Sequence, residues 1–175
     1  MKKFALVSSI LVAVLALTGC SGGGSALGDS QEVGVASSNV RADMTISSVD
    51  TMPMSEAAGI EVEGYENGTL FLVHASLQLT DGDLNEVDTA TFNHRHWKAE
   101  GSKKVEVVDP GFFQKPTVEG CELFSSETVT SLVAGKVADF CQIFVSAETG
   151  AKIESVTFKK SGMKKKPSWT WEVKG

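Results

Sequence analysis

The residue types most capable of chemistry are scarce in this chain of 175 residues, which has three His and three Cys. His94 and His96 lie two positions apart in a segment with strand-like alternation, so both side chains would leave the same face about 6–7 Å apart. Such a pair supplies two ligands to zinc or copper, and Asp88 or Glu100 could add to the three or four donors required. The alternative is a pair of surface histidines flanking Arg95. Two ligands do not define a site, so we predict no bound metal.

Two further motifs lack the residues that their chemistry requires. The stretch 81–85 (DGDLN) matches three liganding positions of a calcium loop, but Glu86 replaces the required glycine and Phe92 replaces the bidentate glutamate. Ser161 and Lys164 have the S-x-x-K spacing of a nucleophilic serine, without the accompanying motifs of that enzyme class. An acidic turn explains the first match better, and chance explains the second. The sequence therefore predicts no catalytic residues and no cofactor.

The N-terminal segment predicts export from the cytoplasm. Residues 4–17 are uncharged and mostly apolar, follow Lys2 and Lys3, and would span about 21 Å as a helix, too little for a bilayer core of about 30 Å. This is the architecture of a cleaved signal peptide. The sequence LTGC that ends at Cys20 resembles the lipobox of bacterial lipoproteins, which implies cleavage before Cys20 and attachment of acyl chains such as palmitate to its thiol. The alternative is an ordinary signal peptide with an incidental cysteine.

The predicted organisation is a signal peptide over 1–19, a lipid anchor with a flexible stalk over 20–39, and one globular domain over 40–175. The stalk prediction rests on a Gly- and Ser-rich run after Cys20 that shows no packing pattern. The lipid would hold the chain at the extracytoplasmic face of the cell membrane. Loss of Lys2 and Lys3 with the leader leaves 14 basic and 22 acidic residues, a net charge of −8, which argues against nucleic acid as a partner.

Cys121 and Cys141 remain once Cys20 is assigned to the lipid, and they form an even pair in an exported domain. Such pairs are usually bonded outside the cytoplasm. Metal or catalytic use of the thiols is the alternative, but neither C-x-x-C spacing nor a nearby His accompanies them. We therefore predict a disulfide, whose loop would stabilise the fold by about 3 kcal/mol.

From residue 40 onward the dominant hydrophobic period is two, which is typical of half-buried strands. The clearest apolar face runs in steps of two from Phe71 to Leu79 and leaves His74 on the opposite side. The run 137–146 is apolar on both faces, which predicts a strand between two layers. Strands are expected over 40–47, 69–80, 89–98, 103–108, 128–133, 137–146, 152–159 and 168–174. This pattern predicts an all-β sandwich of antiparallel strands, and a closed barrel is the alternative.

The layout resembles the immunoglobulin-like, telokin-like domains of surface lipoproteins from Gram-positive bacteria. The resemblance rests on the lipobox and stalk and on four segments: VRADMTISSVD (40–50), NGTLFLVHASLQLT (67–80), LVAGKVADFCQIFVS (132–146) and IESVTFK (153–159). It covers roughly residues 40–160 and implies an immunoglobulin-like β-sandwich at the cell surface. Most members of this group have no assigned activity, so the resemblance implies a fold and a location more than a reaction.

Two C-terminal features allow both a structural and a functional interpretation. Residues 159–175 carry six Lys and one Glu, which could contact anionic lipid or wall polymer or could protect an exposed hairpin. Trp169 and Trp171 share a strand face, and we predict that they belong to the core.

The favoured function is a non-enzymatic module that binds a protein or an envelope polymer, because the chain combines an anchor with a sandwich and shows no catalytic set. One alternative is a substrate- or metal-binding lipoprotein that serves a transporter. The other is an enzyme whose site is assembled from scattered residues.

Overall fold

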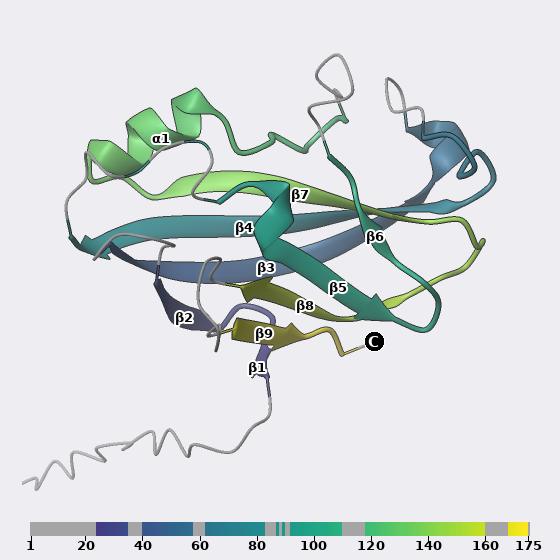
Figure 1. Ribbon diagram of the computed structural model, residues 1–175, viewed down its shortest axis with the longest axis horizontal. Coiled ribbons are helices and arrows are strands. Elements are labelled where there is room, and N and C mark those ends of the chain that lie inside the picture. The colour runs from purple at the N-terminus through teal and green to yellow at the C-terminus, as the bar shows by residue number, and fades with distance from the viewer. Residues whose placement is uncertain are drawn as a thin grey trace, which may run out of the picture.

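The computed structural model describes residues 24–34, 40–57, 62–82, 87, 89, 92–109, 118–159 and 168–174. These residues form two β-sheets that pack face to face (Figure 1), which confirms the predicted all-β sandwich. One sheet has five strands in the order β2–β3–β4–β7–β6, and the other has four in the order β1–β9–β8–β5. The described helical elements are η1 (Met54–Glu56), η3 (His94–His96) and α1 (Ser126–Val133).

The described strands agree with most of the predicted ones. Every named pair is antiparallel except β1–β9, which is parallel. The five-stranded sheet contains β2 (Ser30–Gly34), β3 (Arg41–Pro53), β4 (Thr69–Asp81), β6 (Glu106–Val107) and β7 (Ala138–Ser146). The four-stranded sheet contains β1 (Ser25–Ala26), β5 (Trp97–Gly101), β8 (Ile153–Lys159) and β9 (Ser168–Glu172).

The prediction of a flexible stalk over 20–39 is wrong for residues 25–34, because β1 and β2 are strands of the two sheets. Val33 on β2 is fully buried in the core. The indole Nε1 of Trp171 donates a hydrogen bond to the Asp29 carbonyl at 2.9 Å, so the β1–β2 connection also packs on the domain. The globular domain therefore begins before residue 40. Residues 20–23 and 35–39 of the predicted stalk lie outside the described residues.

The strand predicted over 128–133 is wrong, because this segment is the helix α1. The Ser125 side chain accepts hydrogen bonds from the backbone N–H groups of Glu127 and Thr128, and Thr128 Oγ1 accepts from the Ser125 N–H. This reciprocal capping box fixes the first turn of a helix. Leu132, four residues after Thr128, is fully buried in the core, so helical spacing places both buried side chains on one face of α1. The helix lies beside β7 (Figure 1).

β3 continues beyond its predicted end because it contains a bulge. The register passes from Ile46 opposite Ala75 to Ser48 opposite His74, which leaves Ser47 as an extra residue on β3. One extra residue shifts the alternation of side chains by one position. Three alternate residues face the core before the bulge, as predicted from the period of two: Ala42, Met44 and Ile46.

Before the bulge the even-numbered residues of β3 face the core, and after the bulge the odd-numbered residues do. Val49 packs against the core between the sheets. Ser48 and Asp50 consequently lie on the outer face of the sheet, beside His74 of β4. Without the extra residue, the polar side chains of this half of β3 would be directed at the core.

The main core lies between the two sheets and is rich in aromatic rings. Trp171 is fully buried, and Trp169 packs against the core with its ring centroid 6.1 Å from that of Phe158. The prediction that both tryptophans belong to the core is confirmed. The largest fully buried aromatic side chains are those of Trp171, Phe71, Phe92, Phe144 and Phe158.

A second apolar cluster, which we call the outer cluster, covers one end of the outer face of the five-stranded sheet. Outward side chains of β4 and β7 pack there against Met54, Ala57, Val108 and Val118, which lie on connecting segments. β7 is therefore buried on both faces, which confirms the predicted strand between two layers. The cluster consists of Met54, Ala57, Leu70, Leu72, Val108, Val118, Cys121, Cys141, Ile143 and Val145.

A disulfide between Cys121 and Cys141 ties the covering segment to β7, as predicted, with the two Cα atoms 5.2 Å apart. The Cys141 N–H also donates to the Glu122 carbonyl at 2.6 Å. Both cysteines are buried, so the bond forms part of the outer cluster. It joins positions 20 residues apart in sequence.

We expect the double replacement Cys121→Ala with Cys141→Ala to lower the free energy of unfolding by about 3 kcal/mol, because the unfolded chain regains the freedom that the closed loop removes. Urea denaturation followed by tryptophan fluorescence measures this change. The unmodified chain with its disulfide reduced is the control and should lose a similar amount. Equal midpoints for the oxidised chain and the variant would contradict the assigned stabilising role.

Tyr65 packs against the outer cluster, so titration of its hydroxyl can be used to monitor this packing. The hydroxyl donates a hydrogen bond to the carboxylate of Glu106 on β6, which also pairs with Lys104 Nζ at 2.5 Å. The hydrogen bond stabilises the neutral phenol and raises the pKa of Tyr65 above its ordinary value of 10.0. Since the chain contains one tyrosine, the phenol can be titrated without interference.

The substitution Glu106→Gln is expected to lower the pKa of Tyr65 toward 10.0, because the carboxylate that favours the neutral phenol is removed. Titration of the phenolate absorbance in the ultraviolet measures the midpoint. Glu66→Gln, which removes a nearby carboxylate that does not bond to the hydroxyl, should leave the midpoint unchanged. An equal shift in both variants would mean that the pair does not exist in solution.

Candidate functional site

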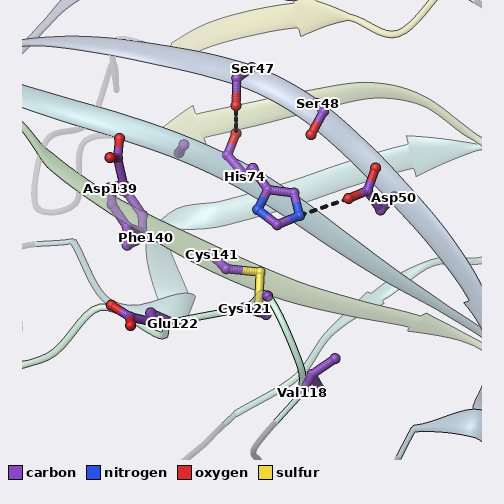
Figure 2. Close-up of a pocket in the computed structure, with 12 residues that line it drawn as sticks. Ser47, Ser48, Asp50, His74, Val118, Cys121, Glu122, Asp139, Phe140 and Cys141 are labelled. Atoms are coloured by element: carbon purple, nitrogen blue, oxygen red, sulfur yellow. Dashed lines mark hydrogen bonds and ion pairs between the residues drawn. A yellow bond between two sulfur atoms is a disulfide. The ribbon is translucent and has the colours of Figure 1, made fainter.

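A pocket of about 730 Å³ lies on the outer face of the five-stranded sheet, at the border of the outer cluster (Figure 2). Strands β3, β4 and β7 contribute to it, and the segment 118–122 that carries the disulfide forms one wall. Its volume is in the range of small-ligand sites. The lining residues are Ser47, Ser48, Asp50, His74, Ala75, Val118, Gly120, Cys121, Glu122, Asp139, Phe140 and Cys141.

His74 occupies the centre of this pocket, with Asp50 on one side and Asp139 on the other (Figure 2). Its Nε2 lies 3.0 Å from Asp50 Oδ2, which is ion-pair distance. The contact lacks hydrogen-bond geometry, and the shielded Nε2 has no hydrogen-bond partner among the described residues. The side chains are 26% and 62% exposed, so solvent screens the pair and its contribution to stability is small.

The charged groups around the pocket are acidic. Asp50, Glu122 and Asp139 supply carboxylates, and none of the described lining residues is Lys or Arg. Asp50 has the His74 ring as its partner, whereas Glu122 and Asp139 form no ion pair within the described part of the chain. Among the described lining residues the carboxylates therefore outnumber the cationic groups, which favours a cationic ligand over an anionic one.

Ser48 and the Asp50–His74 pair are the residue types of a serine nucleophile with its base, but their contacts differ from that arrangement. Ser47 Oγ donates to the main-chain carbonyl of His74 at 3.3 Å. No described hydroxyl group hydrogen-bonds to the His74 ring, which is the contact that activates a serine. The geometry supports binding by charge and hydrogen bonds.

The structure corrects the expectation that His94 and His96 lie on a strand and share a face. The predicted strand over 89–98 is wrong at residues 94–96, which form η3, and β5 begins only at Trp97. The side chain of Asn93 accepts a hydrogen bond from the Arg95 N–H at 3.1 Å and starts this turn. In a 3₁₀ helix two positions correspond to about 240° of rotation, so the two rings diverge.

Each of the two histidines has its own protein partner. His94 Nε2 lies 3.1 Å from Asp109 Oδ2. His96 is buried, with Nδ1 3.1 Å from the Lys159 carbonyl oxygen and its ring against Phe158. These contacts position the loop before β5 and do not bring the two imidazoles to a common point.

The remaining residues that the sequence offers as metal ligands or nucleophiles do not form a metal site within the described part of the chain. Glu100 forms an ion pair with Lys98 at 2.6 Å. Within the described ranges, no group of three or more His, Cys, Asp and Glu side chains is arranged to hold a metal ion. Cys20, Asp88, Glu86, Ser161, Lys164 and most of the basic segment after Lys159 lie outside the described residues.

The alternation of apolar residues predicts His74 on the outward face of its strand, as the structure has it, but does not predict that Asp50 lies beside it. The usable signal is the spacing of apolar residues in β3, where Val49 follows Ile46 by three positions in a segment that otherwise alternates by two. That spacing indicates a bulge, and the bulge is what directs Asp50 toward His74.

No helix in the described part of the chain is long and apolar enough to span a bilayer. The chain matches no protein-family model, no curated protein and no solved structure. The resemblance to immunoglobulin-like lipoprotein domains therefore remains an expectation from the sequence.

We expect the free energy of unfolding to decrease as the pH is lowered below about 6.5, because His94 takes up a proton less readily in the folded chain than in the unfolded chain. Desolvation by burial lowers the pKa of His94 below its ordinary value of 6.5, despite the opposing effect of Asp109. The unfolded chain then takes up the proton at a higher pH than the folded chain does, so acid favours unfolding. Urea denaturation between about pH 7.5 and pH 5 should show a smaller loss for His94→Gln than for the unmodified chain.

The control for this measurement is the range above about pH 7.5, where His94 is neutral in both states and the stability difference between the two proteins should be constant. Identical pH dependence of the two proteins below this range would contradict the lowered pKa.

Proposed function

We propose that this chain is a lipid-anchored bacterial envelope lipoprotein, held at the extracytoplasmic face of the cell membrane through Cys20, whose sandwich domain binds a partner without catalysing a reaction. The partner class proposed from the sequence is a protein or an envelope polymer. The observation that carries the proposal is the buried Cys121–Cys141 disulfide in a chain whose residues 17–20 resemble a lipobox.

The disulfide supports an extracytoplasmic location because cytosolic thiols are kept reduced and structural disulfides persist mainly in oxidising compartments. Its place in the outer cluster indicates a structural bond, since both sulfur-bearing residues are shielded from solvent. The signal segment and Cys20 provide a route to that compartment and an anchor within it.

The pocket supports the binding role. It is preformed on a rigid sheet, is walled by a covalently fixed segment, and combines a central imidazole with carboxylates. Sites built on strands hold their side chains more accurately than sites built on loops. The alternative, a metal-binding lipoprotein that uses His94 and His96, gains no support because these rings bind Asp109 and the Lys159 carbonyl separately.

The anchor would hold the domain close to the bilayer. β1 begins at Ser25, five positions after Cys20, and five residues extend over at most about 17 Å. A ligand would therefore be met at the membrane surface and not at the end of a long tether.

The anchor is tested by expressing the full chain in a bacterium that processes lipoproteins and analysing the mature N-terminus by mass spectrometry. We expect a chain that starts at acylated Cys20 and fractionates with the membrane. Cys20→Ala should remove the acyl mass and the membrane association, whereas Cys121→Ala with Cys141→Ala should retain both. An intact cytosolic chain with a free Cys20 thiol would refute the anchor.

A further inference from the structure

We propose that one end of the four-stranded sheet is a docking surface for anionic lipid headgroups, where Arg95, Lys98 and Lys159 contact the membrane that carries the anchor. This inference rests on the proposed lipid anchor at Cys20 and adds a defined orientation of the domain on the bilayer. It is carried by the distribution of charge along the sheet and by the end at which the N-terminal strand enters it.

The charged side chains on the outer face of this sheet separate along the strands. Lys98 and Glu100 alternate with core residues of β5 and therefore face outward. The register places Glu100 level with Ser155 on β8 and with Glu172 on β9. Lys159 instead is the last residue of β8, four positions beyond Ser155. Acidic side chains thus gather toward the start of β8, and basic side chains gather toward its end.

The turn η3 brings a second cation to the end of β8. His96 Nδ1 lies 3.1 Å from the Lys159 carbonyl oxygen, so η3 and its Arg95 are held beside Lys159. The side chains of Arg95 and Lys159 are exposed, and neither forms an ion pair with another described residue. Lys98 is paired with Glu100 at 2.6 Å. Two cations therefore remain available to an external anion at this end of the sheet.

The N-terminal strand enters the sheet from this same end. β1 lies next to β9 and is parallel to it, with Ser25 opposite Trp171 (Figure 1). Within β1 the direction toward Cys20 is therefore the direction toward Ser168, the first residue of β9, which lies opposite Lys159. Since Cys20 is at most about 17 Å from Ser25, its acyl chains would bring this end of the sheet close to the bilayer.

The sequence adds positive charge next to Lys159. Residues 160–167, which join β8 to β9 and lie outside the described residues, contain four lysines and no acidic residue. The mature chain as a whole has a net charge of −8. A bilayer with anionic lipid would attract the basic end and repel the acidic remainder of the domain. Charge complementarity therefore favours one orientation, with the end of β8 toward the membrane.

Sedimentation with vesicles tests this surface on a chain that starts at Ser21, which contains every described residue and lacks both the leader and the acylation site. Vesicles of phosphatidylcholine with about 30% phosphatidylglycerol are compared with vesicles of phosphatidylcholine alone. We expect binding to the anionic vesicles only, weakened several-fold when the salt concentration rises from about 0.05 to 0.3 M. Equal binding to both kinds of vesicle would overturn the proposal.

Two matched double variants locate the binding on the sheet. Arg95→Gln with Lys159→Gln removes two charges from the proposed surface and should weaken binding roughly tenfold or more, since each cation near an anionic bilayer contributes about fivefold. Lys152→Gln with Lys174→Gln removes two charges from the opposite end, before β8 begins and after β9 ends, and should change binding by less than about twofold. All four side chains are exposed, so both variants should unfold at the same urea concentration as the unmodified chain.

An equal loss in the two double variants, or no loss in the first, would overturn the assignment to this end of the sheet. Soluble polyphosphate, added in place of vesicles, tests an anionic polymer as the partner. Saturable binding of polyphosphate without binding to the anionic vesicles would overturn the assignment to the membrane. The assay uses a chain without acyl groups, so failure of vesicle binding and failure of the lipid anchor are distinguishable.

Discussion

The rest of the structure depends on the need to cover β7 on both faces. Its outward residues Cys141, Ile143 and Val145 are as apolar as its inward Phe140 and Phe144, so a two-layer sandwich alone would leave one of these rows in water. The chain meets this need by laying connecting segments over one end of the sheet. The segment that carries Cys121 is held to β7 by the hydrogen bond from the Cys141 N–H to the Glu122 carbonyl and by an isolated β-bridge between Leu123 and Cys141, and the disulfide adds a covalent link at the same place.

The pocket is a direct result of this partial covering. The segment that carries Cys121 lies beside Cys141, and at this level of the sheet the outer face changes from Leu72 and Ile143 to His74 and Asp139. A covered apolar end and an open polar end therefore meet along one line across β3, β4 and β7. Because the disulfide holds the wall in place, the proposed binding site needs little reorganisation to accept a ligand.

Much of the fold could be predicted from the sequence, because alternation between Phe71 and Leu79 and the doubly apolar run 137–146 are direct consequences of burial on a pleated sheet. The paired cysteines and the core tryptophans were predictable for similar reasons. The elements α1 and η3 could not be predicted in this way, because local hydrogen bonds fix them. The Ser125 cap of α1 and the Asn93 cap of η3 override a β-like pattern of residues. The site could not be predicted either, because Asp50 and His74 meet only through strand pairing between distant segments and a bulge at Ser47.

The single extra residue in β3 also bears on how such a site can arise during evolution. Inserting or deleting one residue in a strand exchanges which side chains of the downstream half point into the core, without altering any codon for those side chains. A change in the position of the insertion would exchange the inward and outward side chains of β3 between the old and the new position, and would so change which of them lie beside His74 on the outer face. Variation in strand length, and not only substitution of side chains, is therefore a route by which this scaffold can gain, lose or relocate a ligand-contacting surface.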